Sequence, residues 1–328
     1  MIIKSKGKVL SLLLIVCLIA IFASVSYGET WKPSKPITLI IPSNPGGGHD
    51  NNARIVAKVA EKYTGQPINV VNQPAGGGVV AYSKMMTADP DGLTVGQVSI
   101  SIVSDQYLIN GCNYNQDSFK YIAQIAADPN NLVVATDGPF GKMNLEEFLE
   151  YARSNPGRVR IGVSGNWTNH DYTRHQIEST AGVKFQRVSI KGGANIVMAV
   201  LAGDLDAGVP YPSEVKGQVD AGKMKILAHN AEERLDLWPD VPTFKERGLD
   251  VVLPIWRIWV LPLETPQEIL DGWYSIMEKT MNDPELKKTY ADTGIGYAFK
   301  GPEETRKVID KAHITYKKII EEAGLEKK

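Results

Sequence analysis

Short runs of β-branched and aliphatic residues alternate with helical patterns along almost the whole chain, and this alternation limits the possible folds more than any other feature. The first cycle runs from the apolar segment Ile37–Ile41 through a glycine-rich turn into a helical pattern over residues 51–63. A second series of cycles begins at Leu132. Chains with this pattern fold as sheets with helices packed on their faces. We therefore predict an α/β protein with mainly parallel sheets.

Two proline-containing breaks divide this alternation into two lobes. The first break is Asp128–Asn131, and the second is Leu253-Pro254, which precedes a strand-like run that we assign to the first lobe. A chain of 328 residues has room for two domains of ordinary size. The predicted boundaries are 29–129 plus 253–328 for lobe 1 and 130–252 for lobe 2.

The first 28 residues have the pattern of a secretory signal peptide. Three lysines precede an apolar run over residues 9–25, and small residues follow it. The run is short for a membrane span, so we expect cleavage after Ser26 or Gly28, with a retained membrane anchor as the alternative. We therefore predict that the protein is exported and works in the periplasm or another extracytoplasmic space.

Composition and motifs exclude several classes of protein. The formal net charge is −1 and no basic block occurs, so nothing indicates nucleic-acid binding. Cys112 is the only cysteine outside the predicted leader, so no intramolecular disulfide can form. The glycine-rich segments match neither G-x-x-x-x-G-K-[ST] nor G-x-G-x-x-G. We predict no cofactor, and we expect a monomer.

The segment Ser43–Asp50, here called turn 1, has the features of an anion-binding turn. Its candidate ligand-binding residues are Ser43, Asn44, Gly46, Gly47, Gly48, His49 and Asp50. Three consecutive glycines let a ligand approach the backbone without meeting a Cβ. We expect Asp50 to cap the following helix, whose remaining N–H groups and positive dipole end then face the turn. The alternative is an ordinary tight turn, but the strand–turn–helix context favours binding of a carboxylate or phosphate.

The segment Ser164–Asp171, here called turn 2, repeats this arrangement in the second lobe, before a helical pattern that starts near Tyr172. Its candidate ligand-binding residues are Ser164, Gly165, Asn166, Trp167, Thr168, Asn169 and His170. In open α/β sheets, ligands bind at the carboxyl ends of the strands. Two lobes that face each other would therefore hold the two carboxylates of one ligand by backbone amides from both turns.

A His-Asp pair occurs in each turn, at His49-Asp50 and at His170-Asp171. Such residues can form a metal or acid–base site when two lobes close. The alternative, which we favour, is that each Asp caps its helix and each His is a polar loop residue, because no His lies at a metal-ligand spacing such as H-E-x-x-H. A secreted metal-dependent hydrolase that uses His49 and His170 is thus the second candidate function.

Three further residues are candidates on weaker grounds. Trp167 is costly to expose, so we expect it to contact the ligand or the opposite lobe, with packing under its own loop as the alternative. Arg257 could pair with a ligand carboxylate, although a surface or hinge ion pair is the more common role of such an arginine. Asn131 could donate to the ligand or cap a turn at the crossing between lobes.

An ordered series of motifs resembles the substrate-binding receptors of tripartite tricarboxylate transporters, also called Bug-type receptors. The matching segments are Pro33–Ile37, Pro45–Asp50, Asn72–Gly78, Asp89–Gly92, Tyr151–Gly157, Gly165-Asn166, Lys191-Gly192, Gly203–Asp206, Ala221–Lys223, Pro239–Thr243 and Thr265-Pro266. The resemblance implies a periplasmic-binding-protein-like (Venus flytrap) fold with an inter-lobe cleft. It implies that turn 1 and turn 2 hold carboxylates largely by backbone amides and ordered water, and it adds Lys191 and Gly192 to the site.

The same resemblance implies no catalysis and implies delivery of the ligand to membrane transporter subunits that this chain does not encode. The sequence departs from the family pattern at Trp167-Thr168-Asn169, at Ile190 before Lys191, and at Arg257 after Trp256. These positions bear on ligand choice, so the ligand is expected to be a di- or tricarboxylate, with an aromatic one included. A receptor that serves a membrane sensor instead of a transporter fits the same sequence.

Overall fold

The computed structural model describes residues 31–104, 108 and 111–324. The described residues from Lys32 onward form one compact unit. The predicted signal peptide lies outside the described residues. Within the described part of the chain, no helix is both long enough and apolar enough to cross a membrane.

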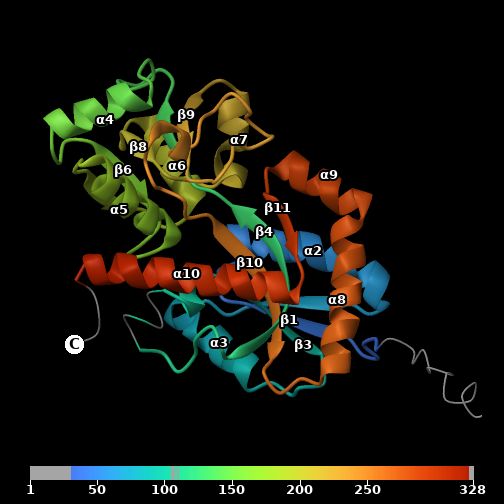
Figure 1. Ribbon diagram of the computed structural model, residues 1–328. Coiled ribbons are helices and arrows are strands. Elements are labelled where there is room, and N and C mark those ends of the chain that lie inside the picture. The colour runs from blue at the N-terminus through green and yellow to red at the C-terminus, as the bar shows by residue number, and fades with distance from the viewer. Residues whose placement is uncertain (1–30, 105–107, 109–110, 325–328) are drawn as a thin grey trace, which may run out of the picture. The chain divides into compact units, whose positions relative to one another are not determined.

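The first sheet has six strands in the order β11-β4-β10-β3-β1-β2 (Figure 1). Their bounds are β1 (Ile37–Ile41), β2 (Ile68–Asn72), β3 (Thr94–Val98), β4 (Phe119–Asp128), β10 (Ile255–Pro262) and β11 (Tyr297–Lys300). β1 pairs in parallel with β2 and β3, whereas β10 runs antiparallel to β3 and β4. β4 and β10 therefore lie side by side at the centre of the sheet.

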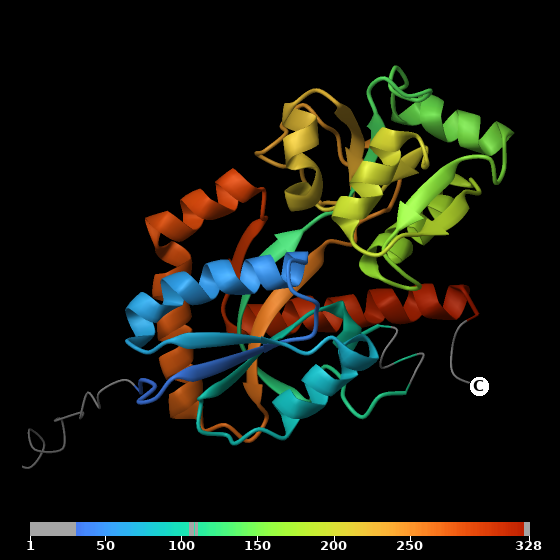
Figure 2. The same cartoon turned by 180° about the vertical axis from the view of Figure 1, so that it is seen from behind.

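Helices cover both faces of this sheet, as the two opposite views show (Figures 1 and 2). They are α2 (Gly48–Thr64), α8 (Gln267–Asn282) and α9 (Pro284–Thr293) on one face, and α3 (Val79–Met86) and α10 (Pro302–Glu322) on the other. Alternation along β10 explains the two layers. Trp259 packs edge-on against Trp273 of α8, while Ile258 and Val260 join the apolar cluster that includes α3 and α10.

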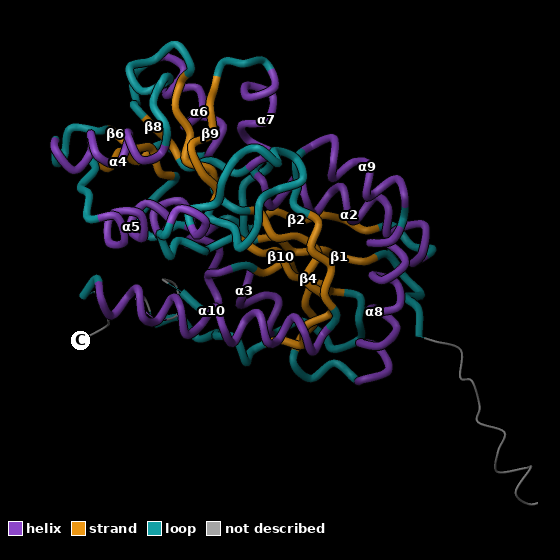
Figure 3. The backbone as a smooth tube through the Cα atoms, turned by 45° about the horizontal axis from the view of Figure 1, so that its top comes forward, coloured by secondary structure: helices purple, strands orange, loops and turns teal. Residues whose placement is uncertain are grey.

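The second sheet has five strands in the order β7-β6-β8-β5-β9, and the backbone tube shows the strands gathered in two groups (Figure 3). The bounds are β5 (Asn131–Ala135), β6 (Arg160–Val163), β7 (Gln186–Ser189), β8 (Ala207–Gly208) and β9 (Met224–His229). The helices are α4 (Leu145–Ser154), α5 (Asn169–Ala181), α6 (Gly193–Ala202) and α7 (Pro212–Asp220). Short 3₁₀ turns lie at Ala75–Gly78, Ile100–Ile102 and Lys245–Arg247. Along β5, Leu132 and Val134 pack with α4 and α5, whereas Val133 packs with α6 and α7.

The prediction of mainly parallel sheets is wrong, because both sheets are mixed. β10 and β11 are antiparallel to their neighbours in the first sheet, and β5 is antiparallel to β8 and β9 in the second. The chain leaves the first sheet through β4 and returns to it through β10, so these two neighbours must run in opposite directions. β11 was not predicted, because its four residues offered no strand pattern distinct from a loop. The sequence also predicts a short helix over residues 104–109, most of which lie outside the described residues.

The two sheets use the segments that the sequence assigned to the two lobes, and we keep the names lobe 1 and lobe 2, although the exact boundaries stay a prediction. Buried amide side chains join the two crossings. Asn230 Nδ2 donates to Leu253 O at 3.1 Å and to Thr173 Oγ1 at 2.9 Å, and Asn130 N donates to Asn230 Oδ1 at 2.6 Å. This network ties both connections to α5, the helix that follows turn 2.

Candidate functional site

Turn 1 and turn 2 follow the same backbone path into their helices. The residue before each helix is extended, with φ −78° and ψ 168° at Gly47 and φ −71° and ψ 167° at Thr168. The residue before that is left-handed in both turns, with φ +79° at Gly46 and φ +53° at Trp167. Trp167 is the only non-glycine residue with positive φ in the described chain, so turn 2 reaches with a strained tryptophan the shape that turn 1 reaches with glycine.

The two aspartates do not cap their helices as predicted. Asp50 Oδ2 accepts a hydrogen bond from Gly46 N at 2.8 Å, and Asp171 Oδ2 accepts one from Trp167 N at 3.0 Å. The helices start at Gly48 and Asn169, three residues earlier than predicted. Each Asp is therefore the third helical residue, and from there its side chain reaches back past the N-terminus. This bond fixes the left-handed residue and leaves the first helical amides without a cap.

Those amides are available to a ligand at both turns. The first helical hydrogen bonds run from Asn51 N to Gly47 O and from Tyr172 N to Thr168 O. The first three backbone N–H groups of each helix precede these bonds and have no acceptor within the described residues. They belong to Gly48, His49, Asp50, Asn169, His170 and Asp171. Unpaired amides at the positive end of a helix dipole bind anions such as carboxylates.

The negative charge of each Asp is balanced next to these amides. Asp50 pairs with Arg54 at 2.9 Å and accepts from Asn72 Nδ2 at 3.0 Å. Burial raises the pKa of Asp50, but these partners and the Gly46 N–H outweigh it and hold the pKa below its usual value. Asp171 pairs with Arg174 at 2.7 Å and with Arg187 at 3.0 Å. Neither carboxylate therefore leaves an uncompensated negative charge to repel an anion.

Both histidines are neutral at pH 7. Burial, and for His49 also the nearby Arg257, lowers the pKa to about 3 for His49 and about 4 for His170. His49 Nδ1 lies 3.1 Å from Gln97 Nε2, an amide donor, so its proton is on Nε2. His170 Nδ1 lies 2.8 Å from Ser164 Oγ. His170 is a buried residue of α5, not the polar loop residue that we favoured, and its ring packs 4.5 Å from the ring of Tyr211.

Arg257 joins turn 1 to lobe 2. It is 1% exposed and pairs with the buried carboxylate of Asp128. A Cβ added to Gly48 would lie 3.0 Å from its Nη2 atom, and its guanidinium lies 5.9 Å from the centre of the Tyr211 ring. Burial lowers the pKa of Arg257 to about 10, so it is charged at pH 7. Arg257 thus forms a buried ion pair with Asp128 at the crossing between lobes, and its guanidinium also borders turn 1.

Unsatisfied buried polar atoms occur at four of the predicted site residues. They are Ser43 Oγ, Asn169 Oδ1, His170 Nε2 and Arg257 Nε, none of which has a hydrogen-bond partner within the described structure. Buried polar groups are normally paired, so such a set marks a place where a ligand or water completes the bonding.

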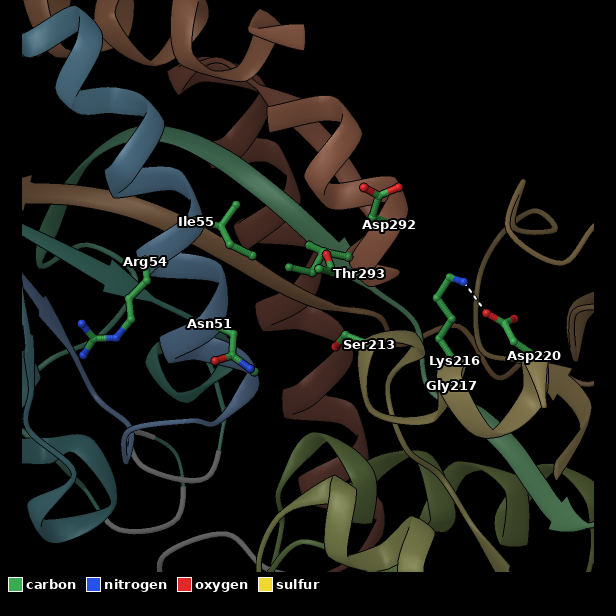
Figure 4. A pocket seen from close by; sticks show the side chains of 11 residues that line it. Asn51, Arg54, Ile55, Ser213, Lys216, Gly217, Asp220, Asp292 and Thr293 are labelled. Carbon is green, nitrogen blue, oxygen red and sulfur yellow. Dashed lines mark hydrogen bonds and ion pairs between the residues drawn. The ribbon is translucent and has the colours of Figure 1, made fainter. Parts of the chain in front are cut away.

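A cavity of about 540 Å³ lies next to turn 1 (Figure 4). It is lined by Gly48, Asn51, Arg54 and Ile55 of α2, by Ser213, Lys216, Gly217 and Asp220 of α7, and by Asp292, Thr293 and Ile295. Gly48 is the only predicted site residue among them. The cavity was not predicted, because α7 carries no sequence motif that connects it to turn 1.

Other predicted residues have different surroundings. Asn131 is fully buried. Its side-chain Nδ2 donates to Pro210 O at 3.0 Å, and its Oδ1 lies 2.6 Å from His229 Nδ1. Because both ends of the side-chain amide already have protein partners, we do not include Asn131 in the proposal below. Lys191 and Gly192 are exposed at the start of α6. Trp167 packs against Tyr172 and His175 of the following helix, α5, and against the cluster that contains Trp256 and Tyr316.

Sequence reasoning missed Asp128, Gln97, Tyr211 and Glu214. Gln97 and Glu214 lie in ordinary strand and helix patterns, whereas Asp128 and Tyr211 lie at the end of a strand and just before a helix, so only the fold brings these four residues to the site. Pro212 followed by Glu214 is typical of the first turn of a helix, but this pattern does not predict which groups the Glu214 carboxylate contacts. Among the described residues, no group of three or more His, Cys, Asp or Glu side chains has a metal-binding arrangement.

Comparisons with known proteins agree with one another. A family model described as "Tripartite tricarboxylate transporter family receptor" matches residues 52–325. The Cupriavidus necator UPF0065 protein in gbd 5'region is 30% identical over 304 residues, covering 90% of this chain and 89% of that protein.

Solved structures extend this likeness to the fold. A TctC solute binding protein from Polaromonas, solved without ligand, is 29% identical with a TM-score of 0.76, over 88% of this chain and 99% of that chain. An R. palustris protein solved with adipate is 22% identical with a TM-score of 0.80, over 89% of this chain and 98% of that chain. These structures confirm the predicted periplasmic-binding-protein-like fold with two α/β lobes.

Proposed function

Because the chain belongs to the tripartite tricarboxylate transporter receptor family, we propose that it is an extracytoplasmic receptor that binds one small carboxylate between turn 1 and turn 2. The observation that carries this proposal is the matched pair of helix N-termini, each preceded by a left-handed residue and each with three unpaired amides. One such turn is common, but a pair with the same backbone path, one in each lobe, suits a ligand held from two sides.

The charges around turn 1 support an anionic group there. Arg257 is a buried cation beside Gly48, and His49 is a neutral donor through Nε2. The protein bound to adipate has the same fold, which makes a dicarboxylate a reasonable first probe. In this proposal the protein is exported, has no catalytic role, and hands its ligand to separately encoded membrane subunits.

A thermal-shift screen of mono-, di- and tricarboxylates tests the binding. A ligand at a hundredfold excess over its Kd should stabilise the protein by about 2.7 kcal/mol. Gly47→Val should abolish the shift, because a β-branched side chain at this position covers the amides of the first helical turn. The melting temperature of this variant without ligand serves as the folding control. If no carboxylate shifts the wild-type melt, the proposal is wrong.

A further inference from the structure

The carboxylate of Glu214 lies close to His170 of turn 2 and to the N-terminus of α6, which directly follows the predicted residues Lys191 and Gly192. Glu214 is the third residue of α7, and its Oε2 atom accepts from Tyr211 N at 2.9 Å and lies 3.7 Å from His170 Nε2. It also accepts from the N–H of Gly193, the first residue of α6. A Cβ on Gly193 would lie only 1.8 Å from Glu214 Oε2, so the carboxylate fills the N-terminus of α6. A ligand carboxylate therefore cannot use that N-terminus.

This buried acid lacks a cationic partner among the described residues. Its side chain is 15% exposed. Burial raises its pKa to about 7, although the two N–H groups of Tyr211 and Gly193 oppose this rise. On its own helix, Lys216 pairs with Asp220, and beyond Tyr211 the guanidinium of Arg257 pairs with Asp128. The first turn of α6 brings no titratable side chain, and Lys191 before it is exposed. A buried carboxylate without a cation is normally disfavoured, so it indicates a partner supplied from outside.

The histidine next to it also lacks a donor. Thr168 Oγ1 donates to Gly165 O at 3.3 Å, and Ser164 Oγ donates to Thr168 Oγ1 at 3.1 Å. In this arrangement the single hydroxyl proton of Ser164 is directed to Thr168 Oγ1, and Ser164 Oγ accepts from His170 Nδ1, which is the tautomer that we adopt for the inference below. In this tautomer the proton of the neutral ring is on Nδ1, and the buried Nε2 is an acceptor that has no hydrogen-bond partner among the described residues.

In lobe 2, the ionised carboxylate of Glu214 and His170 Nε2 are therefore two acceptors 3.7 Å apart, with no donor from another described residue between them. We infer that Glu214 and His170 Nε2 receive a protonated nitrogen of the ligand, so that the ligand is a carboxylate that also carries an amine. This inference rests on the proposed function and deepens it. The ligand carboxylate binds turn 1 and Arg257, and its ammonium group binds Glu214 and His170. Glu214 is then the residue that selects against a second carboxylate.

The neighbouring cavity is consistent with a ligand of no net charge. Its lining holds two bases, Arg54 and Lys216, and two acids, Asp220 and Asp292 (Figure 4). Arg54 is already paired with Asp50, and Lys216 with Asp220. No surplus of cations remains there to balance a dianion, whereas an amino acid brings its own counter-charge.

Matched ligand pairs test the inference. Each pair replaces one carboxylate by an ammonium group on the same backbone length, as in 3-aminopropanoate and succinate, 4-aminobutanoate and glutarate, and 5-aminopentanoate and adipate. For the pair that fits, wild-type protein should bind the amino acid more tightly. Glu214→Gln should weaken that binding about 30-fold or more, the lower end for loss of one partner of a buried charge pair, and should improve binding of the diacid. Glu233→Gln, an exposed acid of the same lobe, should change neither affinity.

Proton linkage provides a second readout that needs no variant. Calorimetric titration at pH 7 in two buffers of different ionisation enthalpy should show release of about half a proton per amino acid bound, because the ammonium favours the charged form of a half-protonated Glu214. Two results would overturn this inference but not the receptor function. One is proton uptake on binding, and the other is a preference of the wild-type protein for the diacid that Glu214→Gln leaves unchanged. Binding of neither series would overturn both.

Discussion

The Arg257–Asp128 pair allows structural stabilisation and ligand binding to be separated by mutation. Arg257 is 1% exposed and Asp128 is fully buried, and Asp128 Oδ1 also accepts from Gly296 N at 2.6 Å. We consider Arg257→Met alone and the double variant Arg257→Met/Asp128→Asn. Methionine keeps the length and most of the volume of the arginine stem, while asparagine keeps the bond to Gly296 and removes the charge.

The single variant leaves a buried, unpaired carboxylate, which should lower the free energy of unfolding by about 3–5 kcal/mol. The double variant leaves no buried charge, and neutral replacements of buried ion pairs are often tolerated, so we expect it to recover most of this loss. Binding should behave differently. Both variants lack the cation beside Gly48, so both should bind the ligand at least about tenfold more weakly, as expected for loss of a charge-assisted bond.

Urea denaturation measures the stabilities, and titration of the ligand found by thermal shift measures the affinities. A single variant that loses less than about 1 kcal/mol would contradict the buried ion pair. A double variant that is stable and binds like wild type would refute the assignment of Arg257 to the ligand site, since stability and binding would then both be independent of its charge.

Three other substitutions test the turns. Trp167→Gly should be more stable than Trp167→Ala by about 1–2 kcal/mol, because both variants lose the ring contacts with Tyr172 and His175 but only glycine relieves the positive φ; a glycine variant no more stable than the alanine variant would contradict the strain. Burial raises the pKa of Glu214 from 4.5 to about 7, so between these pH values the folded state binds more protons than the unfolded state. The free energy of unfolding therefore falls as pH rises through this range. Glu214→Gln should remove this fall, measured as the urea midpoint against pH. Burial lowers the pKa of His170 from 6.5 to about 4, so the free energy of unfolding falls by at most about 3 kcal/mol as pH falls through this range. A pH profile that His170→Gln leaves unchanged would argue against the buried neutral ring.

The opposite signs at Glu214 and His170 have a practical consequence. Between about pH 4.5 and 6.5, the two groups change stability in opposite directions, so the wild-type profile there should be flatter than that of either single variant. Only the two variants measured side by side reveal the separate contributions.

The sequence predicted the strand–turn–helix junctions because they depend on local patterns. The apolar run Ile37–Ile41 matches β1 at both ends, and α4 begins directly after Asn144, whose side chain caps it by accepting from Glu147 N. The family was recognised for the same reason, since its motifs lie in such turns. These elements are determined by neighbours within a few residues.

The rest depended on contacts that sequence spacing does not encode. The left-handed conformation of Trp167 could not be predicted, because tryptophan does not favour it and only the bond to Asp171 holds it there. Asp128, the partner of Arg257, lies more than 100 residues before it in the sequence. Gly193, whose N–H donates to Glu214, is separated from it by the rest of α6 and by β8. The antiparallel direction of β10 follows from the path of the chain between lobes, not from its own residues.

The most direct test is a titration of backbone amide NMR signals with the ligand that gives the largest thermal shift. If one ligand is held from both lobes, the amides of Gly48, His49 and Asp50 and those of Asn169, His170 and Asp171 should shift together, with a single Kd. Shifts confined to one turn, or two different Kd values, would contradict a shared ligand between turn 1 and turn 2.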